Sequence, residues 1–345
     1  MYQSENFHKA AAYSRQHGGQ SFLVMRGGKI IFEDYHDADG ATLPHKLASG
    51  TKSFWGVLAM AAVQDGLLTL DEPVVDTITE WREDPRKSQI TVRHLLAFTS
   101  GLESGKGVLE GNPHQKDIFA RVIDIPSRDM PGNSFTYGPS HLTAFGLLLK
   151  RKLGADPVKY LERRVFHPID LTVANWTRDK VGNPIMAAGA WTTAREWAKF
   201  GELLNKRGIW LDNQLVRSDL LDIMLTGSTA NPGYGMTVWL NVSNAGRKSE
   251  RVRRRPSRAG RDDSGRPSPG SAGRRMLEDI IAAGGKGDQR LFIIRSLDTV
   301  IVRQGDSVRH KGSGQAWSDK KFLALLLGYN ARDPRSPRRR GREGL

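Results

Sequence analysis

The chain has 345 residues, of which 38% are hydrophobic, and this length suggests two domains or one large domain with an insertion. It contains no cysteine, which excludes disulfides, thiol nucleophiles, iron–sulfur clusters and thiolate zinc sites. The longest fully apolar run, residues 54–63, is far shorter than the roughly 18–20 residues that span a bilayer. The first twenty residues hold no hydrophobic segment of the signal-peptide kind. From the chain as given, we expect a soluble cytoplasmic protein with no membrane partner.

The net charge of +15 is concentrated in two segments, residues 247–275 and 331–345, which together carry +12 and leave only +3 for the rest. Both segments are rich in Arg, Gly, Pro and Ser and nearly lack large apolar residues, so burial cannot offset the entropy of ordering them. We interpret them as a flexible insert and a disordered basic tail. A nucleic-acid-binding role and out-of-frame translation of GC-rich DNA are the alternatives. Because the body is nearly neutral and no known binding motif occurs, we expect no specific nucleic-acid partner.

The first predicted element is a β-hairpin over residues 20–35, where two apolar, β-prone stretches flank the glycines of residues 26–29. The run 54–63 is apolar on every side and is followed by Gly66, which predicts a buried helix that begins at residues 49–52. A helix of this kind crosses the interior of a domain.

The middle of the chain is helical in pattern, and strand patterns return near its end. Strands at both ends with helices between them predict an α/β domain built from both termini and interrupted by a helical domain. The late elements are expected at residues 236–240, 290–294 and 299–303 as strands and at 322–327 as a helix. The domain boundaries we expect are 1–85 and 185–330 for the α/β domain, with 247–275 as its insert, 86–184 for the helical domain and 331–345 for the tail.

Several catalytic and ligand-binding motifs are missing from the sequence. There is no G-x-S-x-G nucleophile elbow, no H-E-x-x-H zinc motif and no phosphate loop. The nine histidines are scattered. We therefore expect no metal and no cofactor.

The motif S-x-x-K occurs twice, at Ser49/Lys52 and at Ser318/Lys321. Ser318 precedes an apolar run and is expected to cap the last helix. Ser49 lies where a polar loop enters the buried helix, so Lys52 shares its helix face at about 5–6 Å between Cβ atoms. A dry environment favours the neutral amine, which can take a proton from Ser49. The alternative is an N-capping serine with a snorkelling lysine.

With these residues the chain resembles the serine hydrolases related to class C β-lactamases and to the bacterial carboxylesterases of the same fold. Each matching piece is weak, but their order and spacing are specific. The resemblance implies an α/β protein of the β-lactamase/penicillin-binding-protein type, with an antiparallel sheet flanked by helices and an inserted helical domain. The matching pieces are residues 27–28, 47–54, 90–102, 131–138, 189–195, 234–236 and 282–289.

The resemblance also implies roles for individual residues. Ser49 would be the acylated nucleophile, Lys52 its proton partner and Tyr137 a second base near Lys52. A phenol beside an ammonium is expected to have a lowered pKa, whereas the alternative for Tyr137 is a buried structural tyrosine. The backbone N–H of Lys286 would be the second oxyanion donor. Substrate contacts are expected from Gly285, Tyr234 and Trp191.

Two departures from the family pattern bear on the substrate. Pro139 stands where the β-lactamase and peptidase branches have the Asn of Tyr-x-Asn, and residues 283–285 read Ala-Gly-Gly where those branches have Lys-Thr-Gly. The missing side chains normally hold amide and carboxylate groups, so their loss favours esters. Residues 311–314 resemble the lost motif, but they follow the last strand and are interpreted as a loop.

We expect a serine carboxylesterase that cleaves small-molecule esters through an acyl-enzyme on Ser49. A β-lactamase, a D-alanyl peptidase or a small-amide hydrolase with the same nucleophile is the alternative within the class. A non-catalytic binding or assembly protein of the same fold is the alternative of another class. The presence of Ser49, Lys52 and Tyr137 together argues against the last. The sequence leaves the acyl preference, the alcohol preference and the oligomeric state open.

Overall fold

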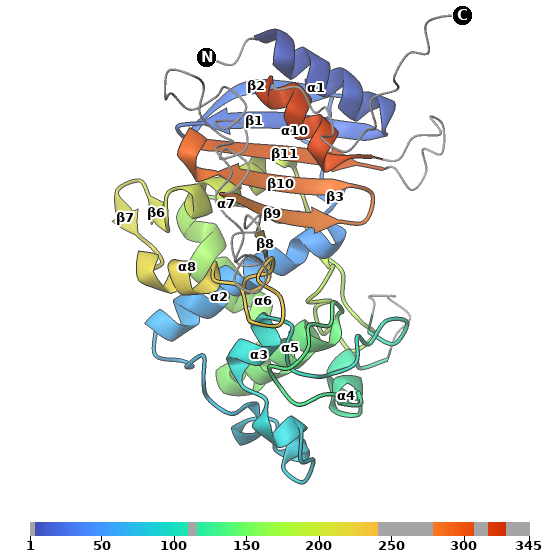
Figure 1. The fold of residues 1–345 in the computed structure, drawn as a ribbon, viewed down its shortest axis with the longest axis vertical. Coiled ribbons are helices and arrows are strands. Elements are labelled where there is room, and N and C mark those ends of the chain that lie inside the picture. The colour runs from blue at the N-terminus through green and yellow to red at the C-terminus, as the bar shows by residue number, and fades with distance from the viewer. Residues whose placement is uncertain (1–3, 110–115, 241–278, 307–316, 329–345) are drawn as a thin grey trace, which may run out of the picture.

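A computed structural model describes residues 4–109, 116–240, 279–306 and 317–328 (Figure 1). The expected Arg-rich insert 247–275, the expected loop at 311–314 and the expected tail 331–345 lie outside the described residues. No helix in the described ranges combines the length and apolar character needed to cross a membrane.

The centre of the fold is a six-stranded sheet in which all neighbouring strands are antiparallel (Figure 1). The two ends of the chain meet in it, because β1 pairs with β11. This confirms the antiparallel sheet flanked by helices that the resemblance implied. In spatial order the strands are β2 (Lys29–Tyr35), β1 (Gly19–Arg26), β11 (Thr299–Gly305), β10 (Gln289–Ile294), β9 (Ile280–Gly285) and β8 (Trp239–Leu240).

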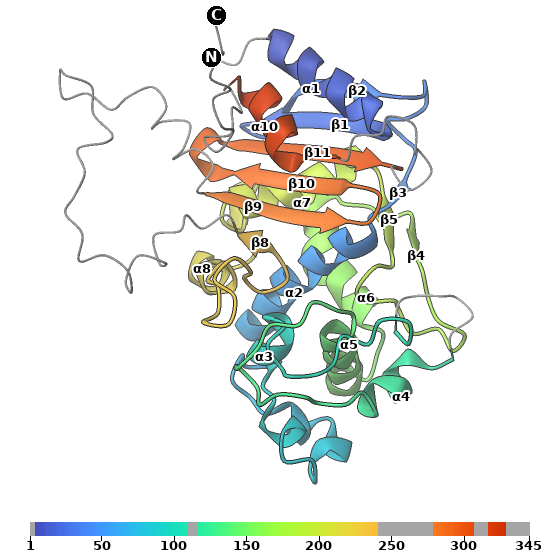
Figure 2. The same cartoon turned by 45° about the vertical axis from the view of Figure 1, so that its right-hand side comes forward.

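Both faces of the central strands β1, β11 and β10 are buried, which explains why these strands are apolar without strict alternation. On β1, Phe22 and Val24 join a core cluster on one face. Leu23 and Met25 join the larger cluster on the other face. Helices α1 (Ser4–Gln16) and α10 (Asp319–Leu327) cover the first face, and α7 (Ala194–Asn205) packs on the second (Figure 2).

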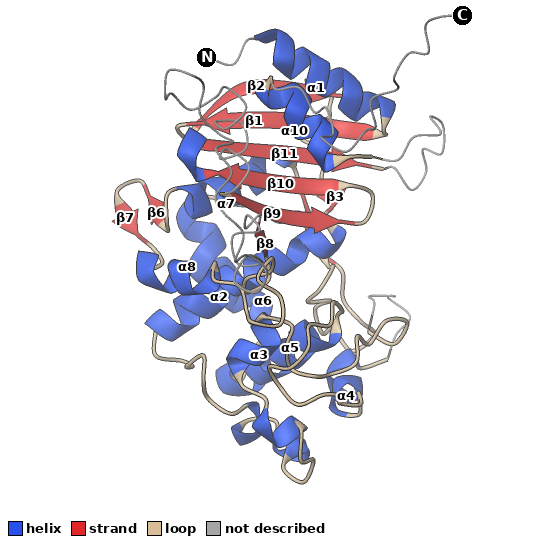
Figure 3. Ribbon diagram, in the orientation of Figure 1, coloured by secondary structure: helices blue, strands red, loops and turns tan. Residues whose placement is uncertain are grey.

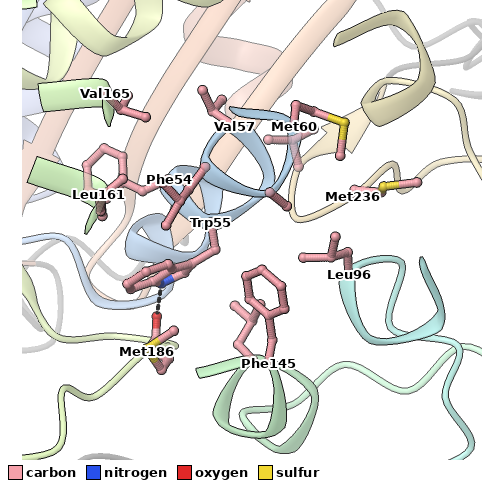
Figure 4. Packing of buried hydrophobic residues seen from close by; sticks show 14 of the residues in the cluster. Phe54, Trp55, Val57, Met60, Leu96, Phe145, Leu161, Val165, Met186 and Met236 are labelled. Carbon is pink, nitrogen blue, oxygen red and sulfur yellow. Dashed lines mark hydrogen bonds between the residues drawn. The ribbon is translucent and has the colours of Figure 1, made fainter. Parts of the chain in front are cut away.

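The predicted buried helix is α2, Lys52–Gln64, and its residues 52–62 are all buried. The side chain of Phe54 packs edge-on against Phe200 of α7, with ring centroids 4.7 Å apart. On another side, Trp55 donates a hydrogen bond of 2.6 Å to the carbonyl oxygen of Met186 (Figure 4). The helix therefore joins the sheet layer to the helices below it, and both belong to one hydrophobic cluster. The two-domain division with its boundaries stays a prediction.

The strand expected at residues 236–240 is shorter than predicted, because only Trp239–Leu240 pairs with β9. Thr237 has φ +71°, a left-handed backbone that interrupts an extended strand. The chain turns there, so that Tyr234 forms an isolated bridge with Trp239. Ser318 caps α10 as predicted, its side chain accepting from the Lys321 backbone N–H at 3.2 Å.

The remaining helices lie mostly below the sheet (Figure 3). These helices are α3 (Val92–Leu96), α4 (Ile118–Ile123), α5 (Ser140–Leu153), α6 (Pro157–Leu161) and α8 (Ser218–Met224). The short strands outside the central sheet are β3 (His45–Lys46), β4 (Asn175–Trp176), β5 (Ala190–Thr192), β6 (Ile209–Trp210) and β7 (Asn213–Gln214).

Candidate active site

Ser49 lies in a 3-10 turn, Ala48–Thr51, that leads directly into α2. The turn is closed by a hydrogen bond of 2.9 Å from the Gly50 backbone N–H to the Leu47 carbonyl. Ala48 has φ +47°, a left-handed conformation that is uncommon and costly for a residue with a Cβ. The chain therefore holds a strained backbone immediately before Ser49, and such strain is characteristic of functional sites.

The side chain of Lys52 contacts Ser49 directly. Its Nζ atom donates to Ser49 Oγ at 2.7 Å and to the Ala187 carbonyl at 2.9 Å. Lys52 is only 4% exposed, so it does not snorkel to solvent. The capping position of the 3-10 turn is Leu47 and that of α2 is Thr51. The alternative of a capping serine with a snorkelling lysine is therefore wrong.

Tyr137 is the third group at this oxygen. It forms a side-chain hydrogen bond with Ser49, and Lys52 Nζ lies 5.1 Å from the centroid of its ring. Burial raises the pKa of Tyr137 above the ordinary value of 10.0, and the hydrogen bond with Ser49 offsets only part of that rise. The expected lowering of the pKa of Tyr137 is therefore wrong, because the loss of hydration on burial raises this pKa more than the hydrogen bond with Ser49 lowers it. At neutral pH Tyr137 is a phenol and a proton donor.

An aromatic cluster supports Tyr137 from behind. Trp239 stacks on its ring with centroids 5.5 Å apart, and Phe98 lies 5.6 Å from it. Tyr234 is 1% exposed and lies edge-on to Tyr137 at 6.1 Å. Burial raises the pKa of Tyr234 well above its usual range. The expectation that Tyr234 contacts substrate does not fit this position, because its side chain is buried beneath Tyr137.

A buried histidine, His141, fixes the loop that carries Tyr137, and no motif in the sequence singles it out. His141 lies within hydrogen-bond distance of the Thr136 carbonyl through Nε2, at 2.7 Å, and of Ser100 Oγ through Nδ1, at 2.8 Å. Because a carbonyl only accepts, Nε2 carries a proton and Nδ1 can accept from the Ser100 hydroxyl. Burial lowers the pKa of His141 to about 4, so the ring is neutral at pH 7.

The edge of β9 approaches the turn of Ser49 very closely. A Cβ on Gly285 would lie 2.1 Å from the Leu47 carbonyl oxygen and 3.1 Å from the backbone nitrogens of Ser49 and Gly50. Only glycine allows this approach. Lys286 follows directly in the sequence, so the backbone after Gly285 continues beside Ser49. Donation from the Lys286 backbone N–H to an oxyanion stays a prediction.

The β9–β10 turn after Gly285 is held from below by Arg303, which is fully buried. Its guanidinium donates to the carbonyl oxygens of Asp288 and His17, both at 2.7 Å. It also lies over the ring of Trp317, 4.2 Å from the centroid. Burial lowers the pKa of Arg303 to about 10, which leaves it charged at neutral pH. Arg303 thus ties the turn to the end of α1.

Two cavities meet at the serine, and Ser49, Tyr137 and Lys286 line both. The larger, of about 880 Å³, includes Trp191, which also donates to Thr177 Oγ1 at 3.2 Å. The other residues lining it include Gln20, His45, Lys46, Lys52, Lys106, Leu109, Pro139, Ile185, Ala187, Gln289 and Asp306. The smaller, of about 440 Å³, is also lined by Trp239, Ala282, Ala283, Gly284, Gly285, Arg290, Phe292 and Asp319.

Predicted site residues are therefore brought together in the structure, with the exception of Tyr234. Gly285 and Trp191 line cavities at Ser49. Trp239 lies just after the matching piece 234–236, but it was missed because that piece does not include it and a tryptophan in a strand pattern is as well explained by packing. Across the described ranges, no three His, Asp or Glu side chains cluster as metal ligands do.

Comparison with known proteins gives matches of three kinds. A family model described as Beta-lactamase matches residues 5–285. "Protein flp" of Staphylococcus aureus (strain COL) is 25% identical over 168 residues, which are 45% of this chain and 34% of that protein. "Acyltransferase mokF" of Monascus pilosus is 30% identical over 155 residues, 37% of each chain. The chain thus spans about a third of the length of these relatives.

Among solved structures, EstCE1, described as a hydrolase with promiscuous acyltransferase activity, superposes with a TM-score of 0.66 at 15% identity. The match covers 88% of this chain and 93% of EstCE1. At that identity the likeness shows the fold alone. The family model, in contrast, covers most of the chain, including Ser49, Lys52, Tyr137 and the β9 edge. The chain belongs to the Beta-lactamase family of serine hydrolases.

Proposed function

We propose that this chain is a serine esterase that hydrolyses small carboxylic esters through an acyl-enzyme on Ser49. The observation that supports this most directly is the contact of 2.7 Å between Ser49 Oγ and the buried Lys52 Nζ. A serine becomes a nucleophile when an adjacent base can take its proton. Tyr137 contacts the same oxygen and supplies a second proton-transfer group.

In the proposed acylation, Lys52 in its neutral form takes the Ser49 proton while Oγ bonds to the ester carbonyl carbon. The backbone N–H groups of Ser49 and Lys286 stabilise the negative oxygen. The bond to the alcohol oxygen then breaks, and this oxygen takes a proton from Tyr137, which regains one from Lys52. In deacylation, water loses a proton to Lys52 as its oxygen bonds to the acyl carbon. Ser49 Oγ leaves, recovers that proton, and the carboxylic acid is released.

The choice of esters over amides rests on the groups around Ser49. Ala283 and Pro139 line the two cavities at the positions where the β-lactamase and peptidase branches have Lys and Asn. Neither side chain can donate a hydrogen bond to an amide or lactam. An ester needs less help, because an alkoxide is a far better leaving group than the amide anion that an amide would release without protonation of its nitrogen. MokF is described as an acyltransferase and EstCE1 as a hydrolase with promiscuous acyltransferase activity, and both descriptions are consistent with an acyl-enzyme.

The test combines labelling with kinetics. A fluorophosphonate probe, mapped by mass spectrometry, is expected on Ser49, and kcat/KM is expected to be much higher for p-nitrophenyl butyrate than for nitrocefin. Ser49→Ala should lose labelling and hydrolysis. Ser318→Ala is the matched control from the second S-x-x-K motif. It should keep both and lose only a helix cap, about 0.5–2 kcal/mol of stability.

Other outcomes of these experiments would contradict the esterase proposal. A label on Ser318, or full activity in Ser49→Ala, would remove the proposed mechanism. A higher kcat/KM for nitrocefin than for the ester would favour a lactamase. A folded protein with neither labelling nor turnover would favour a non-catalytic member of the family.

A further inference from the structure

The larger cavity beside Ser49 has a strong excess of positive charge. Besides Lys52, which the proposed acyl transfer uses in its neutral form, its described lining includes three lysines, Lys46, Lys106 and Lys286, but a single carboxylate, that of Asp306. His45 also lines it, and burial lowers the pKa of that imidazole, so His45 adds no charge at neutral pH. The chain outside the two Arg-rich segments carries a net charge of only +3. The positive charge is therefore concentrated at this cavity and is not a general property of the body.

The side chains of Lys46, Lys106 and Lys286 have no role in the proposed acyl transfer, in which Lys286 acts only through its backbone N–H. Elsewhere on the protein lysines are paired, as Lys152 is with Glu72 at 2.7 Å and Lys206 with Asp298 at 2.7 Å. Within the described residues, the ion pairs include neither Lys46 nor Lys106 nor Lys286. Like charges that converge on a cleft repel one another, but they focus its field and concentrate anions in it.

The smaller cavity has a different character. Its lining is mainly apolar or backbone, with Trp239, Ala283 and Phe292 as examples. Of the two cations that line it, Arg290 donates to the carboxylate of Asp319 at 2.8 Å, so that charge is compensated, and Lys286 lines both cavities. Ser49 thus lies between a basic cavity and a mainly apolar one, so an ester bound across it would place a charged group on one side and an apolar group on the other.

Lys46 is the lysine best placed to contact a group attached to the ester. It lies three residues before Ser49, so their Cα atoms are at most about 11 Å apart. Its strand β3 is paired with β5, where Lys46 is opposite Trp191, and Trp191 lines the same cavity. Lys46 is half-buried, whereas Lys106 and Lys286 are exposed. A partly desolvated ammonium interacts more strongly with an anion than a fully hydrated one does.

We propose that the larger cavity binds a carboxylate carried by the ester substrate, with Lys46 as its main contact. This inference rests on the proposed esterase function and specifies its substrate class as acidic esters. The Lys-Thr-Gly lysine that holds carboxylates in other branches of the family is absent, and Ala283 of that triplet lines the smaller cavity. In this chain the positive charge near Ser49 comes instead from lysines of the larger cavity, and Lys46 lies in a different part of the sequence from that triplet.

The test compares two esters with the same acyl length, 4-nitrophenyl hydrogen adipate and 4-nitrophenyl hexanoate. The wild-type kcat/KM is expected to be higher for the adipate ester and to fall with added salt, because screening weakens the attraction. Lys46→Gln should lower the adipate-to-hexanoate ratio of kcat/KM about tenfold, mainly through KM. Lys46→Arg should restore most of the ratio. Lys29→Gln, an exposed lysine outside both cavities, is the control and should not change it.

A second measurement separates this inference from the esterase proposal. Binding of monomethyl adipate to the Ser49→Ala protein, measured by calorimetry, should weaken about tenfold with Lys46→Gln whether or not any ester is hydrolysed. Hexanoate hydrolysis that depends on Ser49, with a ratio at or below one and no effect of Lys46→Gln, would overturn the acidic-ester inference alone. Loss of Ser49 labelling and of all turnover, with Lys46-dependent binding retained, would overturn the esterase proposal alone.

Discussion

The carbonyl oxygen of Leu47 occupies the space that a side chain on Gly285 would need, since a Cβ there would lie 2.1 Å from it. Two segments far apart in the sequence, the turn of Ser49 and the edge of β9, are thereby in contact. Any side chain at residue 285 must move one of them. The first prediction follows from this contact.

Gly285→Ala is expected to lower kcat by on the order of 10²–10³-fold, the usual effect of losing an oxyanion donor. The measurement is kcat for p-nitrophenyl butyrate together with the melting temperature. Gly284→Ala is the matched control, because the nearest atom to a Cβ there is 3.5 Å away, an ordinary contact with the flexible Arg290 side chain. Equal activities in the two variants would show that the β9 edge takes no part in catalysis.

The second prediction concerns the two groups at Ser49 Oγ. Lys52→Ala and Tyr137→Phe should each lower kcat by on the order of 10²-fold or more, because general acid–base help is typically worth 10²–10⁴-fold. The kcat of the double variant should be only slightly lower than that of Lys52→Ala, since both groups take part in transfer of the same proton. Purely multiplicative losses would indicate independent roles. Wild-type turnover in Tyr137→Phe would assign the tyrosine a structural role.

The raised pKa of Tyr137 also fixes the direction of a pH effect. Burial raises this pKa above 10.0, so the phenol keeps its proton through the neutral and mildly alkaline range. Between pH 7 and 9, the ratio of kcat in wild type to kcat in Tyr137→Phe should therefore stay level. A ratio that rises with an inflection below pH 9 would mean that the phenolate, and not the phenol, is the active form.

The parts of the fold that the sequence predicted are those with a local signal. The hairpin at residues 20–35 has its turn glycines, α2 is apolar on every side, and Ser318 precedes an apolar helix. The S-x-x-K spacing places Lys52 on the face of Ser49, and helix geometry alone brings the two together.

What the sequence could not show depends on contacts between distant segments. The raised pKa of Tyr137 depends on its burial against Phe98 and Trp239, which are distant from it in the sequence. The position of Tyr234 beneath Tyr137 also depends on a contact between distant segments. The basic cavity is assembled from residues 46, 106 and 286, which no local pattern connects. A strand pattern at 236–240 was overridden by the left-handed backbone of Thr237.

The fourth prediction concerns Arg303, whose guanidinium donates to the carbonyl oxygens of His17 and Asp288 in the interior. Arg303→Met should lower the free energy of unfolding by at least about 3 kcal/mol, because it leaves buried carbonyls without donors. Arg82→Met, at an exposed position, should change it by no more than about 0.5 kcal/mol. The measurement is urea unfolding. Similar losses in both variants would show that the buried contacts of Arg303 contribute nothing specific.

The last prediction uses the buried imidazole of His141. Its pKa falls from an ordinary 6.5 to about 4 on folding, so between these values the unfolded chain binds a proton that the folded chain does not. Stability must then decrease as the pH falls from about 6.5 to 4, by on the order of 3 kcal/mol from this group. His141→Gln removes the titration, so its free energy of unfolding should depend less on pH over this interval.

The measurement is urea unfolding at several pH values between 7 and 4 for three proteins. His141→Gln should be less stable than wild type at pH 7, because Ser100 and the Thr136 carbonyl lose a well-fitted partner. The difference should narrow as the pH falls. His8→Gln, at an exposed histidine, is the matched control for a His-to-Gln substitution outside the interior. Carboxylates with lowered pKa, such as Glu80, lose their contribution at lower pH in all three proteins and cancel in the comparison. A constant difference between wild type and His141→Gln would mean that His141 is not held neutral in the folded protein.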